Sequence, residues 1–179
     1  MKIVLGVTSS IAAYKACDIT RLFVKEGHDV FVVMSKNALN LVSPLTFRTL
    51  SGNPVYHETF LPDVYNMGHI ALKENANIFV CAPATANFIG KAASGIADDL
   101  ITTTFLSMKT PIVIAPAMNP DMWSNPAVQH NISVLKKRNI TIIEPDTGDV
   151  VCGDTGYGKL APVNIIVKRS LELLENQNG

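Results

Sequence analysis

Short apolar runs alternate with amphipathic stretches along most of this chain. Runs rich in Val, Ile and Ala have the length and continuous apolar character of strands buried on both faces; they lie at 2–7, 30–34, 77–82, 111–115 and 139–144. Helical spacing fills the intervals, at 11–26, 44–52, 86–94, 98–106, 126–137 and 162–175. Gly27 and Gly52 are typical helix stops, and Ser43 before Pro44 is typical of a helix start.

This order of elements predicts an α/β fold. Short apolar strands separated by helices favour a single-domain, doubly wound parallel sheet of the Rossmann or flavodoxin type, a three-layer sandwich spanning residues 1–179. Ligands of such sheets bind outside the carboxyl ends of the strands, near the switch in strand order. The loops that follow four of the strands therefore form the predicted ligand edge: TSSI at 8–11, SKN at 35–37, PATAN at 83–87 and PAMNPDMW at 116–123.

Two of these loops, TSSI and PATAN, contain residues that could bind a ligand. The segment after the first strand holds only one glycine, Gly6, so the GxGxxG dinucleotide fingerprint is absent. Ser9 and Ser10 lead into a helix N-terminus, which suits a phosphate or another anion, or else one serine simply caps the helix. In PATAN, Thr85 and Asn87 can bond the polar edge of a flat ring, or they form a turn and an N-cap.

Three later features are candidates for substrate chemistry. PAMNPDMW places Asn119 among methionines and the single Trp; such clusters are commonly core, yet a buried amide needs a partner such as a substrate carboxylate or amide. The glycine-rich segment 148–160 predicts a flexible substrate-covering loop, with Lys159 available to an anionic substrate, or else a plain surface loop. His69 precedes a short helix, and from this context alone a structural role is commoner than a catalytic one.

Composition and charge exclude several classes of protein. Apolar residues make up 47% and charged residues 17% of the chain, which argues against disorder. Fifteen Lys and Arg balance fifteen Asp and Glu, so no charge excess favours nucleic acid or an anionic membrane. No apolar run reaches the roughly 18 residues of a transmembrane helix, and we expect a cytoplasmic protein. Cys17, Cys81 and Cys152 form no CxxC pair, which predicts neither a disulfide framework nor a metal site.

Taken together, three segments resemble the homo-oligomeric flavin-containing cysteine decarboxylases. They are HIALKENANIFVCAPATANFIGKAASGIADDLITT, PAMNPDMWSNP and VCGDTGYGKLAP, and the resemblance covers nearly the whole chain. Within that family the sequence is most similar to the bacterial branch that decarboxylates 4′-phosphopantothenoylcysteine to 4′-phosphopantetheine in coenzyme A biosynthesis. The resemblance implies an FMN-dependent carboxy-lyase with sites between the subunits of a homotrimer, sometimes assembled into a homododecamer.

The same resemblance implies roles for individual residues. His69 matches the family's essential histidine, Asn119 the asparagine that binds the substrate carboxylate, and Cys152 the active-site cysteine of the covering loop. His69 and Asn119 would meet across a subunit interface. Residues near the substrate would be Asp149, Val151 and Leu160, with Lys159 added on its charge. Residues along FMN would be Ser9, Ser10, Ile11, Ser35, Asn37, Thr85, Ala86, Asn87, Phe88 and Ala117.

The implied chemistry explains why these groups are needed. Loss of CO2 from a cysteine leaves a carbanion at Cα with no electron sink. Removing a hydride from Cβ and the thiol proton makes a thioaldehyde, and CO2 loss then yields an enethiolate; flavin accepts that hydride and later returns it. His69 is the expected base for the thiol proton. Asn119 would orient the carboxylate without overstabilising its charge, and Cys152 would protonate the enethiolate carbon.

Two departures and three alternatives accompany this interpretation. Family members often carry Arg five residues after the histidine, where this chain has Glu74, and many bacterial relatives carry a substrate-making second domain that does not fit before Gly179. Decarboxylation of a C-terminal peptidyl cysteine, as in lantibiotic biosynthesis, would use the same flavin chemistry. Flavin prenyltransferases share the fold but lack PxMNxxMW. Some relatives are regulatory subunits that bind phosphatases, but the presence of His69, Asn119 and Cys152 together favours the enzyme.

Overall fold

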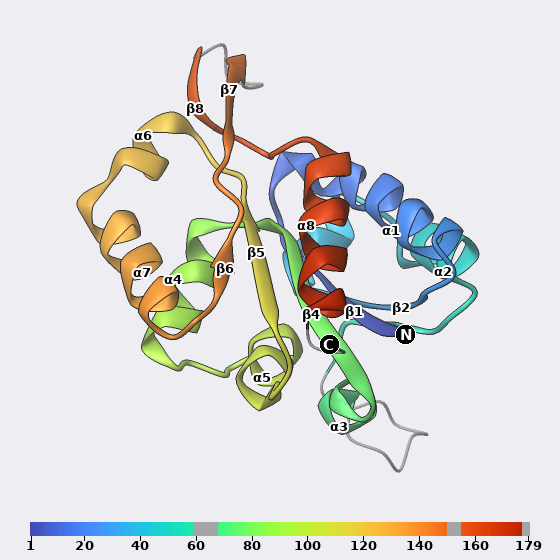
Figure 1. Cartoon of the computed structure of the whole chain (residues 1–179). Helices are drawn as coiled ribbons and strands as arrows, with labels where there is room; N and C mark the ends of the chain where they lie inside the picture. Colours follow the sequence, from blue (N-terminus) through green and yellow to red (C-terminus); the bar gives the residue numbers. More distant parts are fainter. Residues whose placement is uncertain (59–67, 150–154, 177–179) are drawn as a thin grey trace.

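A six-stranded parallel sheet forms the centre of the molecule (Figure 1), a computed structural model that describes residues 1–58, 68–149 and 155–176. The strand order is β3-β2-β1-β4-β5-β6. The strands are β1 (Lys2–Val7), β2 (Asp29–Met34), β3 (Val55–Tyr56), β4 (Ala76–Ala84), β5 (Ile112–Pro116) and β6 (Thr141–Ile142). The winding direction reverses between β1 and β4, so the switch point lies where these two strands end. The predicted doubly wound α/β fold is confirmed.

Helices cover both faces of the sheet (Figure 1). On one face lie α1 (Lys15–Lys25), α2 (Pro44–Ser51) and α8 (Val163–Glu175). On the other lie α4 (Ala86–Ser94), α5 (Leu100–Ser107) and α7 (Pro126–Lys137). The smaller elements are η1 (Ile11–Tyr14), η2 (Lys36–Asn40), α3 (Gly68–Lys73) and α6 (Pro120–Ser124), with the antiparallel pair β7 (Asp146–Asp149) and β8 (Thr155–Lys159).

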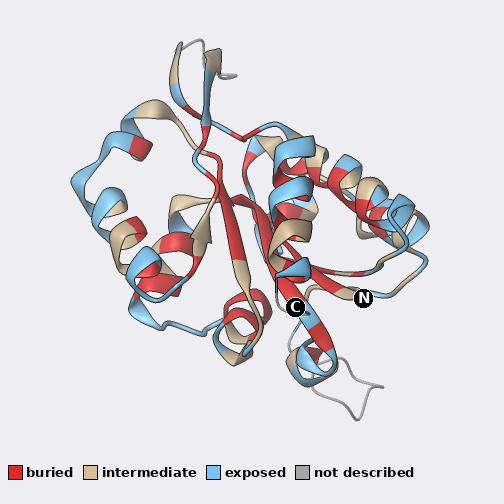
Figure 2. Ribbon diagram, viewed as in Figure 1, coloured by how far each residue is buried: buried red, intermediate tan, exposed pale blue. Residues whose placement is uncertain are grey.

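The apolar runs are explained by two hydrophobic cores, one on each side of the sheet. On β1, Ile3, Leu5 and Val7 pack with α1, α2 and α8, whereas Val4 packs with the helices of the opposite face. Figure 2 shows the central strands buried along almost their whole length. Burying each such aliphatic side chain contributes roughly 1.5–3 kcal/mol, so both faces of these strands must be apolar.

The structure differs from the predicted boundaries in several places. The helix expected at 11–26 is divided, because Ser10 Oγ accepts a hydrogen bond from the N–H of Ala12 and caps a 3-10 turn, η1, before α1 begins. The last strand is much shorter than 139–144, since Asn139 has φ 60° and belongs to the turn after α7. Parts of the segment expected to be a loop form β7 and β8, and the short elements β3 and α6 were not predicted.

No helix within the described ranges is long and apolar enough to cross a membrane.

Candidate functional site

A cavity of about 820 Å³ opens at the carboxyl edge of the sheet, a volume in the range of small-molecule and cofactor pockets. Its walls come from η1 and the start of α1, from PATAN, from the segment after β5 and from the end of β8. A smaller cavity of about 270 Å³ shares Ser9, Asn37, Thr85 and Asn87 with it. The two cavities therefore adjoin at the predicted switch point.

The residues predicted to lie along a flavin converge on these two cavities. The larger cavity is lined by Ser9, Ser10, Ile11, Asn37, Thr85, Ala86, Asn87 and Ala117. Ser35 and Phe88 line the smaller one. Segments separated by more than a hundred positions in the sequence thus meet around one hollow, because the carboxyl ends of parallel strands share one edge.

Thr8, the first residue of TSSI, joins the first loop to PATAN, a role that was not predicted. Its Oγ1 donates to the carbonyl oxygen of Pro83 at 2.8 Å and accepts from the N–H of Thr85 at 2.9 Å. The N–H of Thr8 also donates to Pro83 O, at 3.2 Å. The available signal was a hydroxyl placed directly after the first strand. Thr85 Oγ1 in turn accepts from the N–H of Phe88 and caps α4. PATAN therefore also forms the turn and N-cap that were the alternative to ring binding.

The donor set of the site fits a phosphorylated ligand. α4 and η1 both begin at this edge, and a helix N-terminus presents N–H groups that suit an anion. Ser35 precedes η2 without capping it, and its Oγ is buried with no hydrogen-bond partner among the described residues. A buried hydroxyl normally has a partner. An oxygen-rich ligand such as FMN would supply one, so the residues present fit that cofactor.

The charge of the larger cavity is positive. Lys15 and Lys159 line it, and no Asp or Glu belongs to its lining among the residues described. Lys15 was not predicted; its signal was a cation in the first turn after the ligand loop. In the smaller cavity Lys91 lies 2.7 Å from Asp98, and this hydrogen bond raises the pKa of Lys91. The larger cavity is therefore suited to an anion.

Asn119 lies at the wall of the cavity formed by PAMNPDMW. Its Oδ1 accepts from the N–H of Asp121 at 2.8 Å and caps α6. Met118 and Met122 line the cavity, whereas Trp123 is buried in the core under α7, as the simpler interpretation of this cluster held. The hydrogen bond by which Asn119 caps α6 therefore also positions its side-chain amide at the cavity wall.

Leu160 and Lys159, both expected near the substrate, line the same cavity from the end of the β7–β8 hairpin. Leu160 is buried and Lys159 is exposed. For Asp149 the structure describes only the backbone, which pairs with Thr155. Val151 and Cys152 lie outside the described residues.

His69 is not brought to the cavity within one chain. It is the second residue of α3, which precedes β4 and lies at the opposite end of the sheet from α6 and the hairpin (Figure 1). Neither cavity includes His69 in its lining. Its Nδ1 is buried and has no hydrogen-bond partner in the described part of the chain.

Within residues 1–58, 68–149 and 155–176, no three His, Cys, Asp or Glu side chains are grouped as metal ligands.

The Flavoprotein family model matches residues 1–175. The chain belongs to the Flavoprotein family. Among its curated relatives, the coenzyme A biosynthesis bifunctional protein CoaBC of Bacillus subtilis is 47% identical over 169 residues, covering 93% of this chain and 41% of that protein. The CoaBC protein of Mycolicibacterium smegmatis is 41% identical over 178 residues, covering 99% and 43%. This flavoprotein therefore spans about two fifths of the length of these relatives.

Solved structures give the same family assignment. A cysteine-to-serine mutant of PPC decarboxylase, complexed with pantothenoylaminoethenethiol, has a TM-score of 0.88 and 28% identity, covering 97% of this flavoprotein and 98% of that chain. The FMN-dependent cysteine decarboxylase SpaF has a TM-score of 0.85 and 30% identity, covering 98% and 97%. Peptidyl-cysteine decarboxylase EpiD has a TM-score of 0.80 and 26% identity, covering 98% of each chain. The resemblance to flavin-containing cysteine decarboxylases is confirmed.

Proposed function

We propose that this flavoprotein is an FMN-dependent carboxy-lyase that converts 4′-phosphopantothenoylcysteine to 4′-phosphopantetheine in coenzyme A biosynthesis. The observation that carries the proposal is the larger cavity. It combines Asn119 with two lysines and no acidic lining residue, at the edge where the predicted flavin residues converge. The CoaBC relatives and the pantothenoyl ligand of the PPC decarboxylase neighbour support the same substrate class.

Several residues would hold FMN at the switch point. The helix N-termini behind Ser10 and Thr85 offer N–H donors, and the buried Ser35 hydroxyl offers another. Ala86 and Ala117 are small enough to let a planar ring approach the backbone. When bound, FMN supplies a hydride acceptor and donor next to the substrate Cβ.

Asn119 orients the substrate carboxylate in this proposal. Because its Oδ1 accepts from the N–H of Asp121, hydrogen bonds to a carboxylate come from its Nδ2 group. A neutral amide holds the carboxylate without stabilising its charge as strongly as a cation would, which favours CO2 loss. Lys15 and Lys159 attract the anionic substrate, which carries a phosphate as well as the carboxylate.

His69 takes the thiol proton in this proposal, and this role requires a second copy of the chain. Since α3 lies at the far end of the sheet from Asn119, a single copy holds only part of the machinery. We therefore propose a homo-oligomer, either a trimer or a dodecamer assembled from trimers, in which His69 of one copy serves the cavity of another. We further propose that 148–160 covers the bound substrate, that Cys152 protonates the enethiolate carbon, and that the protein acts in the cytoplasm.

A second candidate is decarboxylation of a C-terminal peptidyl cysteine, which the SpaF and EpiD neighbours favour. Such a substrate presents a carboxylate, which Asn119 would bind, but no phosphate to interact with Lys15 and Lys159. The two curated relatives described above, at 41% and 47% identity, are CoaBC proteins, which favours the phosphorylated small molecule.

One comparison tests the proposal. The purified protein, supplied with FMN, is expected to be yellow and to release CO2 from 4′-phosphopantothenoylcysteine at least about tenfold faster than from a cysteine-ending peptide. A tenfold difference in rate corresponds to about 1.4 kcal/mol in activation free energy. Preference for the peptide would establish the second candidate instead. Protein that is colourless after incubation with FMN and removal of the unbound FMN by gel filtration would contradict both candidate functions.

A further inference from the structure

We infer that Lys2 is a positioning residue for His69, because its ammonium group holds the carboxyl end of α3, the six-residue helix that carries His69. The inference rests on the proposed function only for the role of His69. The hold of Lys2 on α3 rests on the structure itself.

The ammonium of Lys2 is surrounded on several sides. Nζ donates to the carbonyl oxygens of Ala71 at 2.7 Å and of Glu74 at 2.8 Å. The last carbonyls of a helix lack partners within it, and a cation there also meets the negative end of the helix dipole. Nζ further lies 4.6 Å from the ring centroid of Phe31 on β2. One side chain thus joins the end of α3 to the central sheet.

The other end of this connection is rigid, because Lys2 is the first residue of β1, an interior strand paired on both sides. The register of β1 with β4 shifts between Lys2 and Ile3, so Asn77 is an extra residue on β4. Asn77 Oδ1 accepts from the backbone N–H of Lys2 at 2.7 Å. Lys2 therefore binds the chain leaving α3 through both its main chain and its side chain.

α3 depends on such support. A helix of six residues does not form alone in water. Leu72 is its buried apolar contact, and Gly68 packs so that an added β-carbon would lie 3.4 Å from Leu100. Among the described residues, none forms a hydrogen bond with His69 Nδ1. The position of the imidazole ring therefore depends on the position of the α3 backbone. A displacement of about 1 Å in a catalytic group costs roughly 100-fold in rate.

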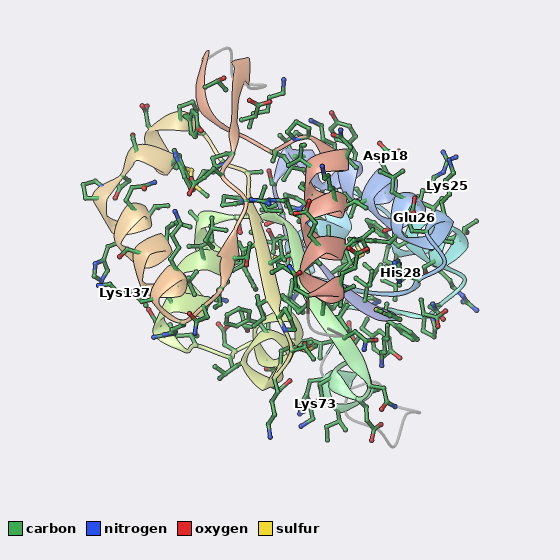
Figure 3. All side chains as sticks on the ribbon, viewed as in Figure 1. Asp18, Lys25, Glu26, His28, Lys73 and Lys137 are labelled. Carbon is green, nitrogen blue, oxygen red and sulfur yellow. The ribbon has the colours of Figure 1, made fainter. Side chains whose placement is uncertain are left out.

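The test compares FMN-loaded Lys2→Met, Lys2→Arg and a matched control, Lys137→Met, whose lysine lies on α7, well away from α3 and Lys73 (Figure 3). Hydrogen exchange of residues 68–74 is measured by mass spectrometry, together with flavin absorbance, kcat and KM. Lys2→Met is expected to accelerate exchange in 68–74 at least about tenfold while α4 and α7 keep wild-type rates. Its kcat should fall about 10- to 100-fold, with KM changed less than about twofold and flavin retained.

Two further variants keep the inference decidable. Lys2→Arg should restore both exchange and kcat, since a guanidinium can donate to two carbonyls. Phe31→Leu keeps an apolar side chain but removes the ring beneath the ammonium, so hydrogen exchange in 68–74 should rise only about threefold. This variant still tests the inference if Lys2→Met does not fold. Wild-type exchange in 68–74 for Lys2→Met, or acceleration spread equally over all helices, would overturn the inference. Full activity of His69→Gln would refute the base role, while the exchange data would still decide whether Lys2 holds α3.

Discussion

The N–H of Met118 donates to the carbonyl oxygen of Gly158 across 2.9 Å, and this bond attaches the β7–β8 hairpin to the loop that carries Asn119. The two backbones lie so close that a β-carbon at position 158 would overlap the carbonyl oxygen of Met118. Met118, Asn119 and Gly158 all line the larger cavity. One wall of the site therefore depends on the absence of a side chain at 158.

Gly158→Ala is expected to separate the hairpin from this loop. The overlap is with backbone, which cannot rotate away, so a cost of about 1–3 kcal/mol is expected, together with at least a tenfold rise in KM for the substrate. Thermal unfolding and steady-state kinetics measure the two effects. Gly90→Ala in α4 is the control, because its β-carbon would meet Asn131 Nδ2 at an ordinary 3.6 Å and alanine favours a helix. An unchanged KM in Gly158→Ala would contradict the prediction.

Asn119→Asp is expected to weaken substrate binding without disturbing the fold. Aspartate caps helices as well as asparagine does, so α6 should persist, but a negative charge then faces the substrate carboxylate. We expect Kd to rise at least about tenfold in a calorimetric titration. Asn125→Asp is a matched control, since Asn125 also caps a helix that begins with Pro, its Oδ1 accepting from Ala127 N at 2.9 Å. Equal affinities in the two variants would count against the assignment of Asn119.

His69→Gln is expected to retain the visible flavin spectrum and lose CO2 release by about 10²–10⁴-fold, the usual contribution of a general base. Spectra and CO2 assays of the same preparation measure both properties. Because His69 lies far from the cavity of its own chain, mixing His69→Gln with Asn119→Asp subunits should restore some activity. A mixture no more active than the sum of the two separate variants would argue against sites shared between copies.

Cys152→Ser is expected to release CO2 but to accumulate an unsaturated thiol in place of the saturated product. The reason is that the proposed proton donor for the enethiolate carbon is lost; the PPC decarboxylase neighbour that holds an ethenethiol is likewise a cysteine-to-serine mutant. Mass spectrometry distinguishes the two thiols by two hydrogen atoms. Cys17→Ser, outside the cavity lining, should form the saturated product at the normal rate. If Cys152→Ser forms the saturated thiol at the normal rate, Cys152 is not the proton donor.

Stability is expected to fall on mild acidification because of His28. Burial and the nearby N-terminal ammonium lower the pKa of His28, with Glu26, beside it in Figure 3, opposing them in part. The unfolded chain then binds more protons than the folded one between the two pKa values, so stability declines as the pH falls from about 6.5 through the lower folded value. Urea unfolding at pH 7.5 and 5.5 measures the decline, which His28→Asn should reduce and the exposed His130→Asn should not. Identical pH dependence in wild type and His28→Asn would contradict this.

Local sequence sufficed for the helices at 86–94 and 126–137, which begin and end where the pattern predicts. Each has an N-cap residue, Thr85 or Asn125, whose side chain bonds the first turn directly. The short strand β3 could not be predicted, because two paired residues leave no recognisable periodicity, and β6 keeps only the middle of the strand predicted at 139–144. Their extended form depends on a neighbouring strand already in place.

The apolar runs were enough to specify a parallel sheet covered on both faces, and hence the edge at which Ser9, Thr85 and Asn119 gather, because burial on two sides demands continuous apolar strands whose ends align. The pattern carried no information on contacts that depend on strand order. The hydrogen bonds of Thr8 to PATAN require β1 beside β4, some 75 residues along the chain. The hold of Lys2 on α3 and the distance of His69 from Asn119 arise in the same way, since packing between remote segments, and not local periodicity, places them.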